Sequence, residues 1–174
     1  WRRSTGMTTL SDKLFGTFLG IEFQGETIVV ISLKSSITGM SLLSSSSFPL
    51  KNDEVSLTEV SDYIKHQVAR PDKIFVSIPD KWTITKFISI PYIKGKGVES
   101  LDSLMRYEIE RHIPYNIEEV AYDFLVIDVK DAAYCILFVV VHKEKMEYIR
   151  KYLESLSLRP DSLIPSSTAV LNTI

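Results

Sequence analysis

The stretch YEIERHIPYNIEEVAYDF, residues 107–124, constrains the fold of this chain more than any other. It begins as a charged helix, and Pro114 ends that helix because proline cannot continue the hydrogen-bond ladder and restricts the residue before it. After a short acidic turn, the residues from Val120 alternate as in a half-buried strand. The junction therefore predicts an α+β fold, in which Ile109 and Ile113 close the helix onto a sheet.

The composition is typical of a soluble globular protein, with 45% hydrophobic and 24% charged residues among 174. A net charge of −2 gives no reason to expect nucleic acid as a partner. The longest apolar run, residues 134–141, is far shorter than the roughly 20 residues of a bilayer span. The single cysteine, Cys135, cannot form an internal disulfide, which is compatible with a reducing cytoplasm.

Apolar periodicity and turn residues divide the chain into two blocks. Ser56 is the expected N-cap of the first helix. The first block comprises a hairpin at 19–34 around Gly25, a strand at 39–50, a helix at 56–71 and a strand at 73–79. The second comprises a strand at 83–90, a helix from 98 to Pro114, strands at 120–130 and 133–142, and a helix at 143–158. The tail supplies one last strand and a helix start, so the second block is inserted before the chain returns to its first sheet.

Four stretches carry a family resemblance: LGIEFQGETIVVISLK, KIFVSIPDKWTITKFISIP, YEIERHIPYNIEEVAYDF and VVVHKEKMEYIRKYLESLSLRPDSL. Together with the element order they resemble the type IV pilus assembly protein PilM, with the cell-division protein FtsA and the type II secretion protein GspL as more distant relatives. The third stretch is the most specific. The residues in the family's places there are Glu108, Ile113, Pro114, Tyr115, Glu118, Glu119, Asp123 and Phe124.

The resemblance covers nearly the whole chain but only about the first half of a PilM protein. It implies an actin-like (ribonuclease H-like) subdomain at residues 14–80 and 159–174. Residues 81–158 are then an inserted strand-helix-strand-strand subdomain of the SHS2 type.

The resemblance also implies a partner. PilM-like proteins bind the short cytoplasmic N-terminus of the inner-membrane protein PilN in the groove between the first subdomain and the inserted one. Aromatic residues can anchor such a peptide, or they can be packing at the subdomain junction. The expected partner-binding residues are Trp82, Ile84, Leu104, Tyr107, Glu108 and Arg111.

Actin-like proteins hold nucleotide phosphate at the first hairpin turn, where the family has Gly-Ile-Asp-Ile-Gly followed by small hydroxyl residues. Here Glu22 replaces the Asp, Gln24 crowds the place of the Gly, and Glu26 adds negative charge. Gly25 and Thr27 complete this degenerate phosphate turn. No cofactor is therefore expected on this chain, and ATP with magnesium is expected only in a longer protein.

No catalytic or metal-binding motif stands out. There is no G-x-S-x-G sequence, and the adjacent acids Glu118 and Glu119 do not converge on one site. The histidines, His66, His112 and His142, have no partner at ligand spacing. Neither an enzyme nor a metal site is expected.

These observations favour a non-catalytic cytoplasmic adaptor, peripherally associated with the inner membrane, in a type IV pilus or type II secretion system. It would bind a PilN-like segment and pass on the state of a motor ATPase. One alternative is an actin-like ATP-binding protein completed by a missing second half. Another is a self-assembling, FtsA-like homo-oligomer. The Ile113-Pro114-Tyr115 junction favours the pilus over the secretion system.

Overall fold

The computed structural model describes residues 16–51, 53–67, 70–91 and 98–167. The described residues up to Pro79 and from Tyr152 onward form one compact unit (unit 1), and Asp80–Lys151 form a second (unit 2). The elements of unit 1 are β1 (Gly16–Gln24), β2 (Thr27–Ser36), β3 (Gly39–Pro49), α2 (Glu54–Gln67), β4 (Lys73–Ile78) and β8 (Ser162–Pro165). Those of unit 2 are η1 (Asp80–Trp82), β5 (Thr83–Pro91), α3 (Val98–His112), η2 (Ile117–Glu119), β6 (Val120–Lys130) and β7 (Ala133–His142). Helix α4 (Lys143–Ser155) begins in unit 2 and ends in unit 1.

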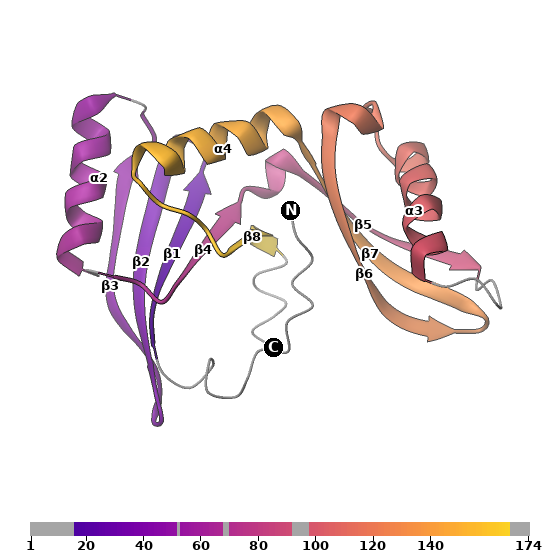
Figure 1. Cartoon of the computed structure of the whole chain (residues 1–174), viewed down its shortest axis with the longest axis horizontal. Coiled ribbons are helices and arrows are strands. Elements are labelled where there is room, and N and C mark those ends of the chain that lie inside the picture. Colours follow the sequence, from indigo (N-terminus) through magenta and orange to yellow (C-terminus); the bar gives the residue numbers. More distant parts are fainter. Residues whose placement is uncertain (1–15, 52, 68–69, 92–97, 168–174) are drawn as a thin grey trace. The chain divides into compact units, whose positions relative to one another are not determined.

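Unit 1 is built on a five-stranded sheet in the order β3-β2-β1-β4-β8 (Figure 1). The hairpin β1–β2 and its neighbour β3 are antiparallel, whereas β4 runs parallel to β1 and β8 parallel to β4. The last strand joins this sheet after the whole of unit 2 has been inserted. The predicted α+β class, with a block inserted before the chain returns to its first sheet, is confirmed.

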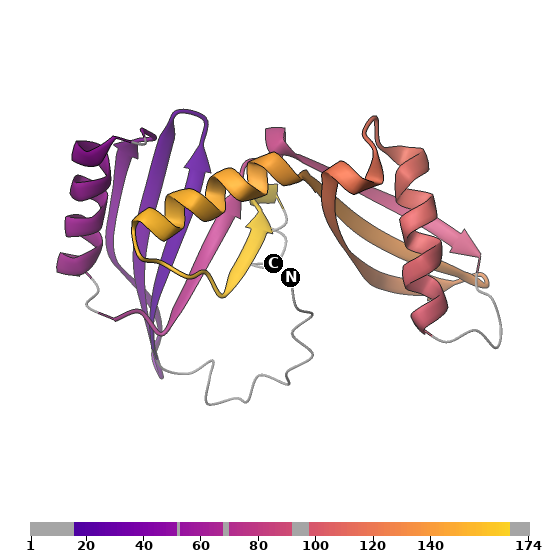
Figure 2. The same cartoon turned by 45° about the horizontal axis from the view of Figure 1, so that its top comes forward.

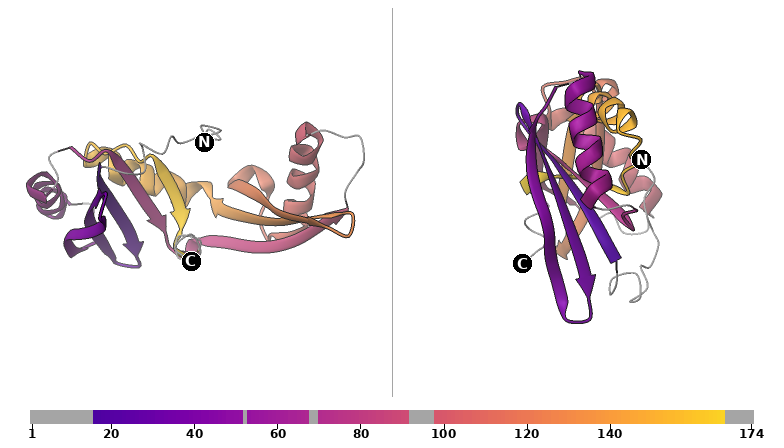
Figure 3. Two further views of the ribbon diagram at one scale, coloured as in Figure 1. Left: turned by 90° about the horizontal axis from the view of Figure 1, so that it is seen from below. Right: turned by 90° about the vertical axis from the view of Figure 1, so that its left-hand side faces the viewer.

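The core of unit 1 follows the alternation of its strands. In β1, Leu19, Ile21 and Phe23 are buried on one face, and Val60 and Ile64 of α2 are buried as well. The Phe23 ring meets the ring of Tyr152 edge-on at 5.7 Å between centroids. Phe48 of β3 packs in the same way on Tyr63 of α2, which lies against the sheet (Figure 3, right).

The start of α2 differs from the sequence prediction. The helix begins two residues earlier than the predicted cap, and Asp53 caps it by accepting a hydrogen bond from the backbone N–H of Ser56 at 2.9 Å. Ser56 is itself buried in the first turn. The prediction was wrong because Asp and Ser are comparable N-caps, and only packing decides which one lies at the boundary.

Unit 2 is a three-stranded antiparallel sheet in the order β5-β7-β6, with α3 across one face (Figures 2 and 3). Its element order is the predicted strand, helix, strand, strand. Met105 and Ile109 of the helix, and Ile113 directly after it, are buried in one core with Ile136 and Phe138 of the central strand. The predicted role of Ile109 and Ile113 in closing the helix onto the sheet is therefore confirmed.

Helix α4 stops at Ser155, three residues before the predicted end at residue 158. Ser157 has a positive φ of 58°. Its N–H bonds to the carbonyl of Glu154 and the N–H of Leu158 to that of Leu153, which is the Schellman arrangement. This local turn thus ends the helix before Pro160.

The two units differ slightly from the predicted subdomain limits, because the second boundary falls after Lys151 and not after residue 158. Residues 14, 15 and 168–174 of the predicted first subdomain lie outside the described residues. None of the helices described is long and apolar enough to cross a bilayer.

Candidate partner-binding site

Unit 2 contains an open pocket of about 280 Å³, which we call the aromatic pocket. It lies where the chain enters the unit at η1 and β5 and where β7 passes into α4. Its lining residues are Lys81, Trp82, Thr83, Ile84, Tyr115, Val140, His142, Glu144 and Lys145. Two of the six predicted partner-binding residues, Trp82 and Ile84, are among them.

Local bonding holds Trp82 at one wall. The Thr83 hydroxyl donates to the carbonyl of Asp80 at 3.1 Å, which fixes the single turn of η1 that carries the indole. The Trp82 ring meets Tyr148 edge-on at 6.0 Å between centroids. The Lys145 ammonium lies 5.3 Å from the centre of the same indole, within cation–π range.

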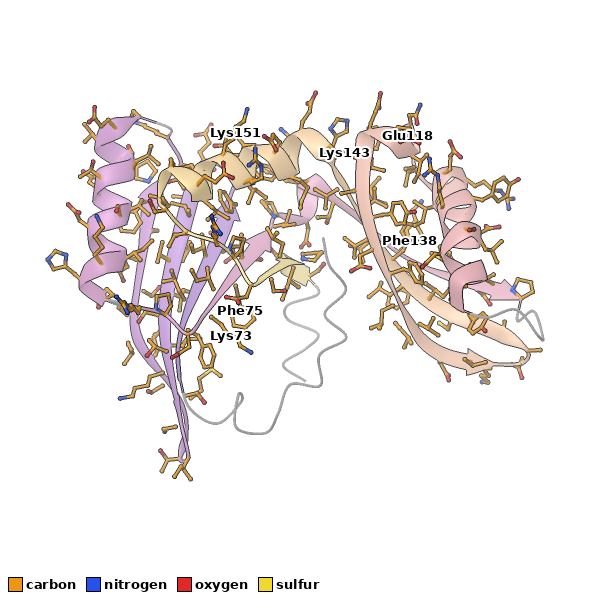
Figure 4. All side chains as sticks on the ribbon, in the orientation of Figure 1. Lys73, Phe75, Glu118, Phe138, Lys143 and Lys151 are labelled. Carbon is orange, nitrogen blue, oxygen red and sulfur yellow. The ribbon has the colours of Figure 1, made fainter. Side chains whose placement is uncertain are left out.

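Tyr115 and His142 form a second aromatic wall. Tyr115 follows the proline that ends α3, and its ring meets the imidazole of His142 edge-on at 5.6 Å. Asn116 then caps η2 by accepting from the N–H of Glu118 at 2.9 Å. The Lys143 ammonium donates to the carbonyl of Glu118 at 2.6 Å, which ties the start of α4 to this junction (Figure 4). The 107–124 junction therefore also positions a pocket wall.

The aromatic pocket combines aromatic rings with charged side chains of both signs. Burial raises the pKa of the Tyr148 phenol beside Trp82 above its usual value. Ile84 and Val140 supply aliphatic surface. Lys81 and Lys145 supply positive charge, and Glu144 supplies a negative charge. Such a site binds a side chain by contact with flat rings, with charge at the mouth.

The other four predicted residues lie on α3. Leu104 packs against the hydrophobic core of unit 2 and is only half-buried. Tyr107 is 61% exposed, and the Arg111 guanidinium lies 6.0 Å from the centre of its ring. Arg111 also pairs with Glu108 at 3.4 Å. Among the described residues that line the aromatic pocket, none comes from α3, so the predicted set divides into two groups.

The predicted phosphate turn lies between β1 and β2. Gly25 has a positive φ of 63° there. The Gln24 amide donates to the carboxylate of Glu22 at 2.8 Å, and the Thr27 hydroxyl donates to the carbonyl of Gln24 at 3.0 Å. The polar groups of this turn thus bond to one another.

Tyr115, His142 and Lys145 were not predicted as members of one site. The signal for Tyr115 was its position directly after the helix-ending proline. No local sequence pattern marks His142 or Lys145 as a site residue. Both come close to Trp82 because β7 pairs with β5 and then continues into α4. Within the described ranges, no group of three or more His, Cys, Asp or Glu residues could hold a metal ion.

No protein-family model matches this sequence, and no curated protein does. Solved structures do match. A chain of the PilM–PilN type IV pilus biogenesis complex aligns with a TM-score of 0.68 and 18% identity, over 88% of this chain and 48% of that one. The cytoplasmic domain of EpsL, an inner-membrane component of the type II secretion system of Vibrio cholerae, aligns with a TM-score of 0.62 and 15% identity, over 86% and 57%.

At these identities the similarity concerns the fold, and this chain spans about half the length of each neighbour. Both systems that the sequence resemblance named are represented, so the fold does not separate pilus from secretion. The chain has the fold shared by a component of the PilM–PilN complex and by the cytoplasmic domain of EpsL.

Proposed function

We propose that this chain is a non-catalytic adaptor on the cytoplasmic side of an inner-membrane assembly platform, of the type IV pilus or type II secretion kind. It binds a short cytoplasmic segment of a PilN-like membrane protein and relays the state of a motor ATPase. The observation that carries the proposal is the aromatic pocket around Trp82, on a fold also found in the PilM–PilN complex.

The side chains of the aromatic pocket are better suited to binding a peptide than to catalysing a reaction. Its rings and aliphatic side chains offer contact surface, and its charged groups lie on exposed side chains at the mouth. Peptide anchors use this combination of a flat aromatic wall and a polar rim. The exposed pair of Tyr107 and Arg111 on α3 offers a second contact surface for a longer segment.

The test is calorimetric titration of the whole chain with a synthetic peptide covering the cytoplasmic N-terminus of its PilN-like partner. We expect binding near micromolar, about −8 kcal/mol. Trp82→Ala should weaken it at least about tenfold. Phe87→Ala is the matched control, since Phe87 is a 63% exposed aromatic of the same unit that does not line the pocket. Absence of heat at several temperatures with folded protein, or equal loss in both variants, would contradict the proposal.

Tyr107→Ala separates the two predicted groups. If the peptide contacts only the aromatic pocket, this variant binds normally. If the peptide also runs along α3, it loses affinity together with Trp82→Ala.

A second candidate function is nucleotide binding completed by a longer protein. Its supporting observation is that β1, β4 and β8 are parallel, so their carboxyl ends meet at one edge, where ligands bind in open α/β sheets. At that edge the Ser77 and Ser166 hydroxyls lie 2.8 Å apart, and Ser166 donates to Glu22 at 3.4 Å. Titration with a fluorescent ATP analogue and Mg²⁺ tests it. We expect no binding to this chain, and binding here would favour the nucleotide function.

A further inference from the structure

Unit 1 contains a second pocket, of about 470 Å³, which no part of the proposed function uses. Its walls come from the second half of α2, from the segment leading into β4 and from the turn after α4. We call it the basic-rimmed pocket. Its lining residues are Ser61, Ile64, Lys65, Arg70, Pro71, Ile74, Leu156, Ser157 and Leu158.

The floor of this pocket is aliphatic. Ile64, Ile74 and Leu156 are 6%, 9% and 7% exposed, and Leu158 and Pro71 are half-buried beside them. The volume lies within the range of about 300–1,000 Å³ that is usual for ligand pockets. The floor can therefore accept at least one large apolar side chain.

The charge on the rim has one sign. The charged residues that line the pocket are Lys65 and Arg70, and both are exposed. Asp72 and Asp161 do not line the pocket, and their carboxylates accept hydrogen bonds from the N–H groups of Thr17 and Ile74, each at 2.7 Å, while keeping their negative charge. The Asp62 carboxylate, one turn before Lys65, lies 3.9 Å from the Lys65 ammonium. Both side chains are exposed, and such an ion pair contributes little to stability. Both charged side chains that line the pocket are therefore cations, which can pair with an anionic group.

The polar groups of the pocket lie at its mouth and not in its floor. Small-molecule sites fix their ligands with a few polar groups placed inside an apolar cavity. Peptide interfaces instead bury an apolar anchor and surround it with a polar rim. The exposed Ser157 hydroxyl adds a rim donor at a backbone position where glycine is usual. This arrangement corresponds to a peptide site.

We propose that the basic-rimmed pocket binds a short acidic–apolar peptide segment of a partner protein, whose apolar side chain enters the floor while a neighbouring carboxylate pairs with Lys65 or Arg70. The site lies in unit 1, apart from the aromatic pocket in sequence and in lining residues, and does not depend on the function proposed above.

The test uses methyl-labelled whole chain and the peptide acetyl-Ser-Glu-Asp-Leu-Phe-Glu-Asp-Ser-amide, up to about 1 mM. We expect shifts at the methyl groups of Ile64, Ile74, Leu156 and Leu158. Replacing the peptide's acids by lysine, or its Leu-Phe pair by alanines, should abolish them. Raising the salt concentration should weaken binding, because the rim charges are exposed.

Variants of the lining residues test whether the peptide binds at the basic-rimmed pocket. Lys65→Glu with Arg70→Glu should weaken binding at least about tenfold. Lys34→Glu with Lys51→Glu, the matched control, makes the same charge change on exposed lysines of unit 1 that do not line the pocket, and should leave binding intact. Ser61→Trp should block the pocket and prevent peptide binding, although Lys65 and Arg70 are both still present. Trp82→Ala should have no effect, which separates this site from the aromatic pocket.

Four results would overturn the proposal. These are no methyl shift in wild type, equal binding of the lysine peptide, equal loss in both double variants, and shifts with dodecanoate but not with peptide, which would indicate a lipid site. Shifts that grow with protein concentration without peptide would identify a second copy of the chain as the occupant and would overturn it as well.

Discussion

The turn between β6 and β7 shows how a single residue departs from the usual turn chemistry. Lys130 pairs with Ala133, so the loop has two residues, and Asp131 and Ala132 both have positive φ, 53° and 58°. A two-residue hairpin of this kind prefers Asn-Gly or Asp-Gly. Ala132 therefore occupies a conformation that costs an L-residue about 1–2 kcal/mol.

Ala132→Gly should stabilise the protein by about 0.5–1 kcal/mol, because relief of the left-handed conformation exceeds the extra entropy that glycine gains on unfolding. Denaturant unfolding checks this. The control is Ala133→Gly, one residue further into β7, which should destabilise by about 0.5–1 kcal/mol. The same sign in both variants would show that the turn is not under strain.

Asp53 provides a pH-dependent contribution at the start of α2. The backbone N–H of Ser56, and then its hydroxyl, hold the pKa of the Asp53 carboxyl below its usual value. A carboxyl with a lowered folded-state pKa adds stability above its unfolded pKa of about 3.9, and that stability is lost as pH falls through the folded value.

Asp53→Ala should therefore lower the Tm at pH 7 by about 2–4 °C, through loss of the cap. The difference in Tm between Asp53→Ala and wild type should disappear as the pH falls below about 4. Thermal melts across pH check this, with Glu59→Ala on the exposed face of α2 as a control that removes an acid without removing a cap. A difference that persists unchanged at low pH would contradict the assignment.

At the scale of elements, helix α3 depends on the few residues that it buries. Ile109 is fully buried in the core of unit 2, and the next residue, Glu110, is exposed. Strand alternation and helix periodicity are local properties of the sequence, so each described β-strand and α-helix could be predicted from it, whereas the short 3-10 helices η1 and η2 were not predicted. Helix ends were less predictable, because Asp and Ser are comparable N-caps at the start of α2 and because Ser157 takes a positive φ where glycine is usual.

Ile109→Ala should destabilise the protein by about 2–5 kcal/mol, since it leaves a cavity between α3 and the sheet. Glu110→Ala should change the stability by no more than about 0.5 kcal/mol. Chemical denaturation of both variants checks this pair. A small effect of Ile109→Ala would mean that the helix does not form the core of this unit.

At the scale of the whole molecule, unit 2 has a core of its own. All members of that core, and the hydrophobic residues packed on it, lie between Ile84 and Val140, within one continuous segment. Unit 1, by contrast, is completed by β8, which pairs with β4 only after the inserted unit.

A fragment of residues 80–151 should therefore fold alone, since domains of about 60 residues can do so. Its amide spectrum should overlay that of the whole chain over β5, α3, β6 and β7, and it should melt cooperatively. A collapsed, poorly dispersed spectrum would show that unit 2 requires unit 1. A fragment of residues 16–79 is the comparison and should not fold, because it lacks β8 and Tyr152.

Periodicity, proline stops and motif spacing act over a few neighbouring residues, so the α+β class, the order of the elements, the inserted block and the resemblance to PilM could all be predicted from the sequence. Which side chains meet follows from the three-dimensional fold. Trp82, Tyr115 and His142 line one pocket, and Lys65, Arg70 and Leu156 another, because strand pairing and helix packing bring distant segments together. Those contacts join residues that are far apart in the sequence, and no local pattern specifies both members of such a pair.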